Sequence, residues 1–440
     1  MSRRARALIL ERPRLAIVAL HAAFALLFFG AALARGVPRG RLIAGDALFY
    51  YAYLPSWVID HDVDLTNDLE KLRGATGAPL KYQPTVTGKA SSPYAIGTAL
   101  LDLPFFGAGL ALDRLAGGRG DGYGWMAQAS MCLGGISYAC AGTLLLLRLL
   151  RRWFDLEVAF AATVGFELAS SLVYYVLVSP AYAHAASFFA VTVFVTAWIA
   201  TRDHLSARDA IVLGAAAGLM TLVRWQDSVF VVVTAVPLVA RLCARSIGAE
   251  ERARILRFAA LASVAALVVF SPQLWVWHSI YGSWLTIPQG DTWVRWGQPE
   301  LAATLVSLDD GGLFTWTPIT LLGLAGLWRF REREPALALG AALALALDIY
   351  VEATVHHGLG AAYGSRRLVG ATALFAMGFA ALLDALRSRR PPWAAWLLVG
   401  ALVSWNGLLL TEYQWLAHAP GRTGPYPTLR ELIRHTPFRR

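Results

Sequence analysis

Charged side chains are scarce in this sequence, and cysteines and lysines are scarcer still. Of the 440 residues only 15% are charged, whereas 57% are hydrophobic and the mean hydropathy is +0.51. Because a soluble domain carries about 25% charged residues, the composition excludes an ordinary soluble protein and predicts a polytopic membrane protein. The 16 Trp and 15 Tyr residues are typical of anchoring at the membrane interface.

The three cysteines exclude a disulfide-stapled fold. Cys132 and Cys140 would lie about two turns apart on one helix, too far to bridge, and no Cys spacing indicates a metal site. The net charge of +10 comes almost entirely from arginine. Since the arginines interrupt apolar runs instead of lining one face, they exclude a nucleic-acid partner and act as topology signals.

Apolar runs predict an all-α protein with roughly 11–12 transmembrane helices in a single integral domain, 1–440. The first run is too long for the core of a signal peptide, so we expect it to be retained. Between the helices we expect a first outer loop at 36–92 and a second at 279–312, with a short tail at 412–440. The predicted helices span 15–35, 123–147, 157–178, 181–200, 209–223, 227–242, 258–278, 313–329, 336–354, 367–386 and 393–411.

Arginine clusters orient these helices, because positive loops stay in the cytoplasm. Placing all the clusters there means that segment 93–115, which carries Asp102 and Pro104, dips into the outer leaflet or lies along it instead of crossing. The alternative is a true span with the charge rule broken once near Arg148. The clusters are Arg148/Arg151/Arg152, Arg202/Arg208, Arg241/Arg245/Arg252/Arg254/Arg257, Arg329/Arg331/Arg333 and Arg387/Arg389/Arg390.

The predicted topology brings five polar segments to the non-cytoplasmic side. They are 36–92, 179–184, 224–227, 279–312 and 356–367. Because the cytoplasmic arginine clusters alone fix this arrangement, the meeting of these segments on one side indicates a site there.

Asp46 follows Gly45 at the exit of the first helix and has two interpretations. It could cap the next helix, a role that Asp fills well, or its carboxylate could accept a proton from an incoming hydroxyl. The following helix, 47–59, carries apolar residues at helical spacing, so we expect an amphipathic juxtamembrane helix with Tyr50 at headgroup depth.

Acids that alternate in the same loop could hold a metal. Asp60, Asp62 and Asp64 would share one side of an extended segment. Their oxygens suit Mg²⁺, Mn²⁺ or Ca²⁺ bridging a phosphate; the alternative is a solvated acidic loop.

Basic groups on the outer side could hold an anionic headgroup. Lys81 and Lys89 could bind a phosphate or extend to lipid headgroups. Arg224 and Arg366 stand where positive charge is disfavoured, so each needs an acidic partner or an anionic ligand. His184, Gln226 and Asp227 are candidates for positioning the substrate, with Tyr50.

Acids within apolar runs support a rival function. Glu167, Asp348 and Glu352 would be costly in a membrane unless they are functional or paired. They suit a proton-coupled lipid or solute transporter. A scaffold without catalytic activity is the third possibility.

The pattern resembles the GT-C superfamily of integral-membrane glycosyltransferases, including the protein O-mannosyltransferase-like and aminoarabinose transferase-like enzymes. The resemblance rests on Asp46 after the first helix, the loop acids, Lys81 with Pro84, and the 214–224 helix ending in arginine. Two features depart from the family: Gln83 replaces the first residue of a Pro-Pro pair, and no acidic pair follows Asp46.

The resemblance implies inverting transfer of a sugar from a polyprenyl-phosphate donor to a lipid, glycan or protein acceptor. By this resemblance Asp46 is the general base, and Lys81 or Lys89 with Arg224 holds the phosphate. It also implies a bacterial inner membrane enzyme whose site faces the periplasm or the exterior.

Overall fold

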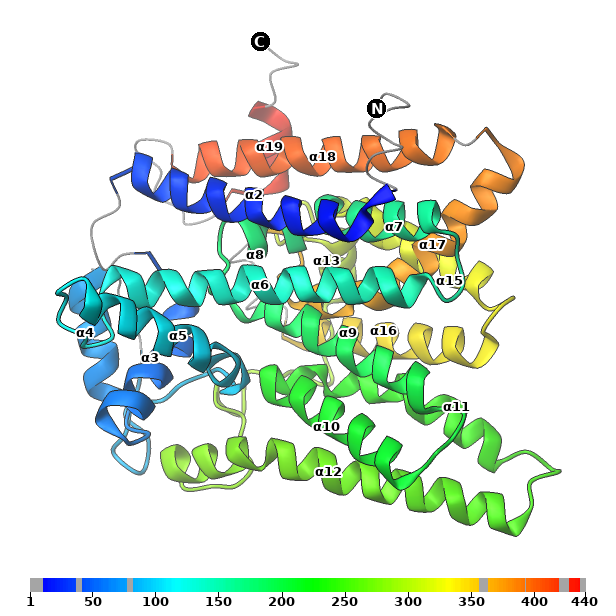
Figure 1. Ribbon diagram of the computed structural model, residues 1–440, viewed down its shortest axis with the longest axis horizontal. Coiled ribbons are helices and arrows are strands. Elements are labelled where there is room, and N and C mark those ends of the chain that lie inside the picture. The colour runs from blue at the N-terminus through cyan, green and yellow to red at the C-terminus, as the bar shows by residue number, and fades with distance from the viewer. Residues whose placement is uncertain are drawn as a thin grey trace.

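The computed structural model describes residues 11–36, 42–76, 82–355, 363–391, 393–418 and 427–435. Its long helices run roughly parallel to one another, while α3 and α4 gather at one end of the bundle (Figure 1). Apart from one isolated bridge between Pro84 and Ala90, the described residues form helices, turns and loops. The helices are α2 (Pro13–Ala34), α3 (Ala47–Pro55), α4 (Thr66–Thr76), α5 (Gly97–Leu115), α6 (Trp125–Leu150), α7 (Leu156–Ala169), α8 (Leu172–Leu177), α9 (Ala183–Thr201), α10 (Ala207–Val223), α11 (Val232–Leu242), α12 (Ala249–Tyr281), α13 (Leu301–Val306), α14 (Leu313–Trp316), α15 (Pro318–Phe330), α16 (Pro335–Thr354), α17 (Thr372–Arg389), α18 (Trp393–Ala417) and α19 (Leu429–His435), with the 3₁₀ segments η2 (Trp225–Val231) and η4 (Arg366–Ala371).

The prediction of an all-α polytopic membrane protein is confirmed. Each predicted apolar run is helical, although the run at 157–178 breaks at Ser170 into α7 and α8, and the run at 313–329 breaks at Thr317 into α14 and α15. Within the described residues, eight helical segments are long and apolar enough to cross a membrane. Shorter helices such as α10 and α15 pack among them, so hydropathy and length together identify fewer spans than the roughly 11–12 expected.

Small residues let the helices approach closely. A Cβ on Gly214 of α10 would lie 2.2 Å from the carbonyl oxygen of Ala262 in α12, and one on Gly218 would lie 2.6 Å from that of Ala266. In lipid, such contacts between backbones replace the hydrophobic effect as the source of helix association. The Gly-x₃-Gly spacing therefore fixes α10 against α12, and with it the position of the residues that follow α10.

The helix expected at 47–59 forms, but it is not a surface helix. Every residue of α3 is buried, and a π-helical turn (Ser56–Asp60) extends it. The aromatic side chains that suggested an interfacial position instead pack inside the protein: Tyr51 meets Phe106 of α5 edge to face at 5.7 Å. The prediction of an amphipathic exposed helix was wrong because α5 and the loops cover its second face.

Helix α5 lies antiparallel to the first half of α6. Tyr138 of α6 donates a hydrogen bond to the carbonyl of Leu101, and Gly109 lies against Ser130. The chain beyond α5 returns to the side of the first outer loop, where the Tyr123 hydroxyl bonds to Asp68. This path favours the first of the two predicted topologies for 93–115, a helix that does not cross.

The intramembrane acid Glu167 has a local partner. Its Oε1 lies 2.8 Å from Nε2 of His21, and its Oε2 accepts a hydrogen bond from Thr143 at 3.2 Å. His21 in turn donates from Nδ1 to the carbonyl of Ile17 at 2.9 Å. Glu167 therefore joins α2, α6 and α7 inside the bundle, as expected for a buried acid in lipid.

Candidate functional site

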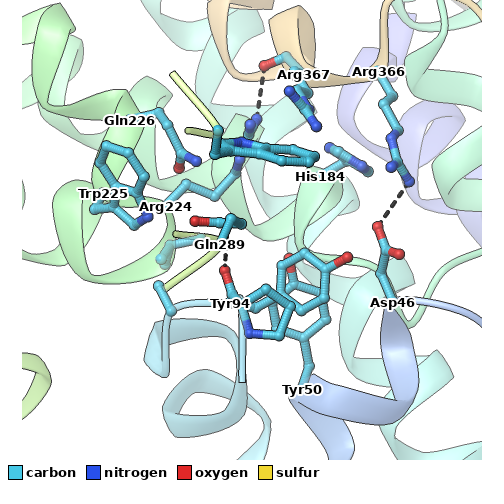
Figure 2. Close-up of a pocket in the computed structure, with 14 residues that line it drawn as sticks. Asp46, Tyr50, Tyr94, His184, Arg224, Trp225, Gln226, Gln289, Arg366 and Arg367 are labelled. Carbon is cyan, nitrogen blue, oxygen red and sulfur yellow. Dashed lines mark hydrogen bonds and ion pairs between the residues drawn. The ribbon is translucent and has the colours of Figure 1, made fainter. Parts of the chain in front are cut away.

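Helix ends meet around one cavity of about 270 Å³ at the end of the bundle that carries the first outer loop. Residues from all five predicted outer segments line it, so the expectation that these segments converge is confirmed. Figure 2 shows Asp46 and Arg366 together on one side of the cavity, with Trp225 and Gln226 on the opposite side. The lining residues are Asp46, Tyr50, Pro93, Tyr94, Ala95, His184, Val223, Arg224, Trp225, Gln226, Gln289, Trp293, Arg366 and Arg367.

Asp46 enters the cavity from the start of α3. Gly45 precedes it with φ +60°, and a Cβ there would lie 2.3 Å from the Tyr182 hydroxyl, so the turn requires glycine. The Asp46 carboxylate does not cap α3. Its Oδ2 instead accepts a bond of 2.8 Å from Nη1 of Arg366 (Figure 2). With 24% of its side chain exposed, the carboxylate remains open to the cavity.

Two tyrosines cover the floor beside Asp46. The rings of Tyr50 and Tyr94 lie 4.8 Å apart, and both residues line the cavity. Burial and the nearby Asp46 carboxylate raise the pKa of both phenols. Their hydroxyl groups therefore stay protonated and available as hydrogen-bond donors.

Arg224 is placed by the end of α10. It adopts an extended conformation directly after the helix and is only 7% exposed. Its Nη1 donates to the carbonyl of Arg367 at 2.7 Å and lies 3.9 Å from Oδ1 of Asp227. Asp227 accepts a second bond from Ser187 at 2.6 Å and does not line the cavity. It therefore holds Arg224, where we had expected it to position a substrate.

Glu352 supports two guanidinium groups from behind. Its Oε1 lies 3.9 Å from Nη2 of Arg224, and its Oε2 lies 3.5 Å from Nη1 of Arg367. Both Glu352 and Asp348, one turn earlier in α16, are buried. On its cavity side Arg367 lies 5.5 Å from the centre of the Trp293 ring. The acids thus face the backs of the arginines, while the guanidiniums face the cavity.

Uncharged polar groups complete the lining. His184, at the start of α9, packs against Tyr175 with ring centroids 4.2 Å apart. Gln289, in the loop after α12, donates from Nε2 to the carbonyl of Pro93 at 2.7 Å. Gln226 lies beside Arg224 on the same rim (Figure 2). These side chains can donate or accept hydrogen bonds without adding charge.

The predicted lysines do not reach this cavity in the part of the chain that the structure describes. Nζ of Lys89 donates to the carbonyl of Ser279 at 2.9 Å, which ties the first outer loop to α12. Lys81 lies outside the described residues, as do His356 and His357 of the last outer segment.

The three loop aspartates do not form a shared metal site. Asp62 accepts bonds from Ser56 and from the backbone of Asp64, and Asp60 accepts one from Asn67. Their oxygens are directed to separate partners, and the described residues contain no group of three or more His, Cys, Asp or Glu side chains suited to a metal. The donor set expected for Mg²⁺, Mn²⁺ or Ca²⁺ therefore does not fit.

Several lining residues had no role in the sequence interpretation. Tyr94 lies in segment 93–115, just before α5, and Gln289 and Trp293 lie in the second outer loop. The available signal was the tryptophan content of that loop, since Trp284, Trp293 and Trp296 occur within one short stretch.

The overall fold is similar to that of two proteins of known structure. The structure of ArnT from Cupriavidus metallidurans bound to undecaprenyl phosphate aligns with a TM-score of 0.56 and 16% identity, over 92% of this chain and 66% of ArnT. The oligosaccharyltransferase AglB from Archaeoglobus fulgidus, in complex with an inhibitory peptide and a dolichol-phosphate, aligns with a TM-score of 0.51 and 13% identity, over 96% of this chain and 60% of AglB. This chain therefore spans less than two thirds of either structure. No family model and no curated protein sequence matches it.

Proposed function

We propose that this protein is an inverting membrane glycosyltransferase that moves a sugar from a polyprenyl-phosphate donor to an acceptor hydroxyl. One observation carries the proposal: the cavity joins the Asp46 carboxylate to three guanidinium groups at one end of the bundle. Polyprenyl phosphates occupy the two structures of the same fold, which supports a donor of this class. The acceptor is a hydroxyl of a lipid, a glycan or a protein.

Asp46 is the general base of the proposed reaction. It takes the proton from the acceptor hydroxyl as that oxygen attacks the anomeric carbon. The bond from this carbon to the phosphate oxygen breaks, and the polyprenyl phosphate leaves with the bonding electron pair. Attack from the face opposite the leaving group inverts the anomeric centre. The exposure of the carboxylate to the cavity supports this role.

Arg224, Arg366 and Arg367 are the phosphate-binding groups. Guanidinium groups match phosphate oxygens in geometry and charge, and they stabilise the negative charge that develops on the leaving group. Arg366 also holds Asp46, so one residue links the leaving-group side of the cavity to the base. Gln226 and His184 then position the sugar or the acceptor from the rim.

We place this reaction on the outer face of a bacterial inner membrane. Reporter fusions test the orientation. A reporter fused at Gly118 should report a position outside the cytoplasm, and a reporter fused at Arg152 should report a position in the cytoplasm. These two positions flank α6, which is long and apolar enough to cross the membrane between them. A cytoplasmic reporter signal at Gly118 would contradict both the site's orientation and a non-crossing α5.

The direct test is transfer by purified protein in liposomes. We expect it to release polyprenyl phosphate from a polyprenyl-phosphate sugar only when an acceptor hydroxyl is present, and to form the product with inverted anomeric configuration by NMR. Retention of configuration rejects the single-displacement chemistry. If no polyprenyl phosphate of any chain length binds, the proposed donor class is wrong.

A transporter remains the second candidate, because Asp348 is buried without a hydrogen-bond partner for its Oδ2 among the described residues. The pairings of Glu167 with His21 and of Glu352 with two arginines favour the transferase. These acids already have partners that explain their burial.

A further inference from the structure

Positively charged side chains outnumber negatively charged ones among the residues that line the cavity. Among the described residues that line it, the only carboxylate is that of Asp46, which is bonded to Arg366 at 2.8 Å. The nearby acids Asp227 and Glu352 are about 1% exposed and lie behind the arginines. A ligand in this cavity therefore contacts positively charged guanidinium groups and uncharged donors and acceptors of hydrogen bonds. The Asp46 carboxylate, which it can also reach, is already paired with Arg366.

Two buried atoms at the lining still need hydrogen-bond partners. Oε1 of Gln289 and Nδ1 of His184 have none within the described part of the chain, and His184 is only 6% exposed. The bond from Gln289 Nε2 to Pro93 orients the amide, which leaves Oε1 as an acceptor. Because buried polar atoms without partners are costly, both atoms point to a ligand that carries hydroxyl groups.

Aromatic surface stands next to these atoms. Trp225 and Trp293 both line the cavity, and Figure 2 shows Gln289 between the Trp225 rim and the Tyr94 ring. Such a combination of flat apolar faces with a few directed polar groups is typical of small-molecule sites. A sugar ring offers both apolar C–H faces and hydroxyl groups at its edge.

We infer that this cavity selects a donor whose sugar is uncharged and rich in hydroxyl groups, and that it discriminates against a sugar with a free amino group. The inference rests on the proposed function and adds the class of sugar. At neutral pH an amino sugar carries an ammonium charge. Here the ammonium would find no carboxylate free to pair with it, because Asp46 is bonded to Arg366 and the acids Asp227 and Glu352 lie behind the arginines.

Binding of three synthetic lipids to the full-length protein in nanodiscs tests the inference. The probes share one polyprenyl chain and carry phosphate alone, phosphate with glucose, or phosphate with a 4-amino-4-deoxyglucose. We expect the glucose lipid to bind at least 10-fold more tightly than the amino-sugar lipid. Equal binding, or tighter binding of the amino sugar, overturns the inference.

Substitutions at Gln289 test whether this side chain contacts the sugar of the donor. Gln289→Ala should weaken binding of the glucose lipid about 5-fold to 10-fold and leave binding of the bare polyprenyl phosphate unchanged, since only the sugar reaches this amide. Gln289→Glu supplies the missing carboxylate and should shift the preference at least 10-fold toward the amino sugar. Equal losses for the bare and the glucose lipid in the Ala variant, or no shift in the Glu variant, reject Gln289 as a sugar contact.

The bare lipid separates this inference from the proposed function. If the wild-type protein does not bind polyprenyl phosphate, the proposed function fails. If it binds the bare lipid but does not distinguish the two sugars, only the inference about sugar charge fails. Thermal unfolding of each variant in the nanodisc, expected to match wild type, verifies that a loss of binding reflects the cavity.

Discussion

Asp46→Asn lowers the rate of sugar transfer by roughly 10²-fold to 10⁴-fold, the usual contribution of a positioned general base. The amide cannot accept the proton of the acceptor hydroxyl, but its oxygen can still accept the bond from Arg366 that Oδ2 now takes at 2.8 Å. Binding of the donor should therefore change little. The measurement is single-turnover transfer at saturating donor, with donor affinity determined separately.

Asp113→Asn is the matched control for this experiment. Asp113 is half-buried in α5 and accepts a bond from the backbone of Gly120, but it does not line the cavity. We expect wild-type transfer from this variant and wild-type unfolding temperatures from both. Normal transfer by Asp46→Asn removes Asp46 from the mechanism.

The same variant distinguishes the transferase from the transporter. A transporter that uses a buried acid for coupling should be more sensitive to Asp348→Asn than to Asp46→Asn, and a scaffold should tolerate both. For the transferase the order is reversed, because Asp348 is 2% exposed and absent from the cavity lining. Comparing the loss of activity in Asp46→Asn with that in Asp348→Asn in the same assay therefore distinguishes the transferase, the transporter and the scaffold.

Arg224→Gln and Arg366→Gln each weaken binding of polyprenyl phosphate by about 10-fold to 100-fold. A hydrogen bond to a charged group contributes about 1.5–3 kcal/mol, and every 1.4 kcal/mol is a factor of about ten in affinity. We expect KM for the donor to rise more than kcat falls, because the phosphate is held both before and during transfer. Calorimetric titration with a short-chain polyprenyl phosphate measures the affinity directly.

Two controls keep this result interpretable. Arg119→Gln changes an exposed arginine near the same end of the bundle, outside the cavity, and should leave donor affinity unchanged. Arg224→Lys retains a charge opposite Asp227 and Glu352, so it should fold even if the neutral variant does not. If neither Arg224→Gln nor Arg366→Gln alters affinity, the phosphate is bound elsewhere.

The fate of the basic residues illustrates how far the sequence could lead. Lys89 and Arg224 satisfied the same sequence criterion, a cation on the outer side that needs a partner. The structure gives Lys89 a backbone carbonyl of α12 and gives Arg224 a position on the cavity. Nothing in the sequence around either residue distinguishes these outcomes, because the deciding partners lie far away in the chain.

The burial of α3 has a similar origin. Its leucines and tyrosines suit a membrane interface as well as a protein interior, since both offer apolar contacts with occasional polar partners. Only the position of α5 beside α6, which covers the second face of α3, selects the interior.

The amino-acid sequence by itself determined the helices, the membrane class and the meeting of the polar segments at one end of the bundle. These follow from local properties: the length of apolar runs, and arginines that stay on one side. The tertiary structure alone decided which groups touch. Asp46 and Arg366 are separated by 320 positions in the chain. Their contact depends on the relative positions and rotations of closely packed helices, because these place the residues at the helix ends. No local sequence pattern encodes that packing.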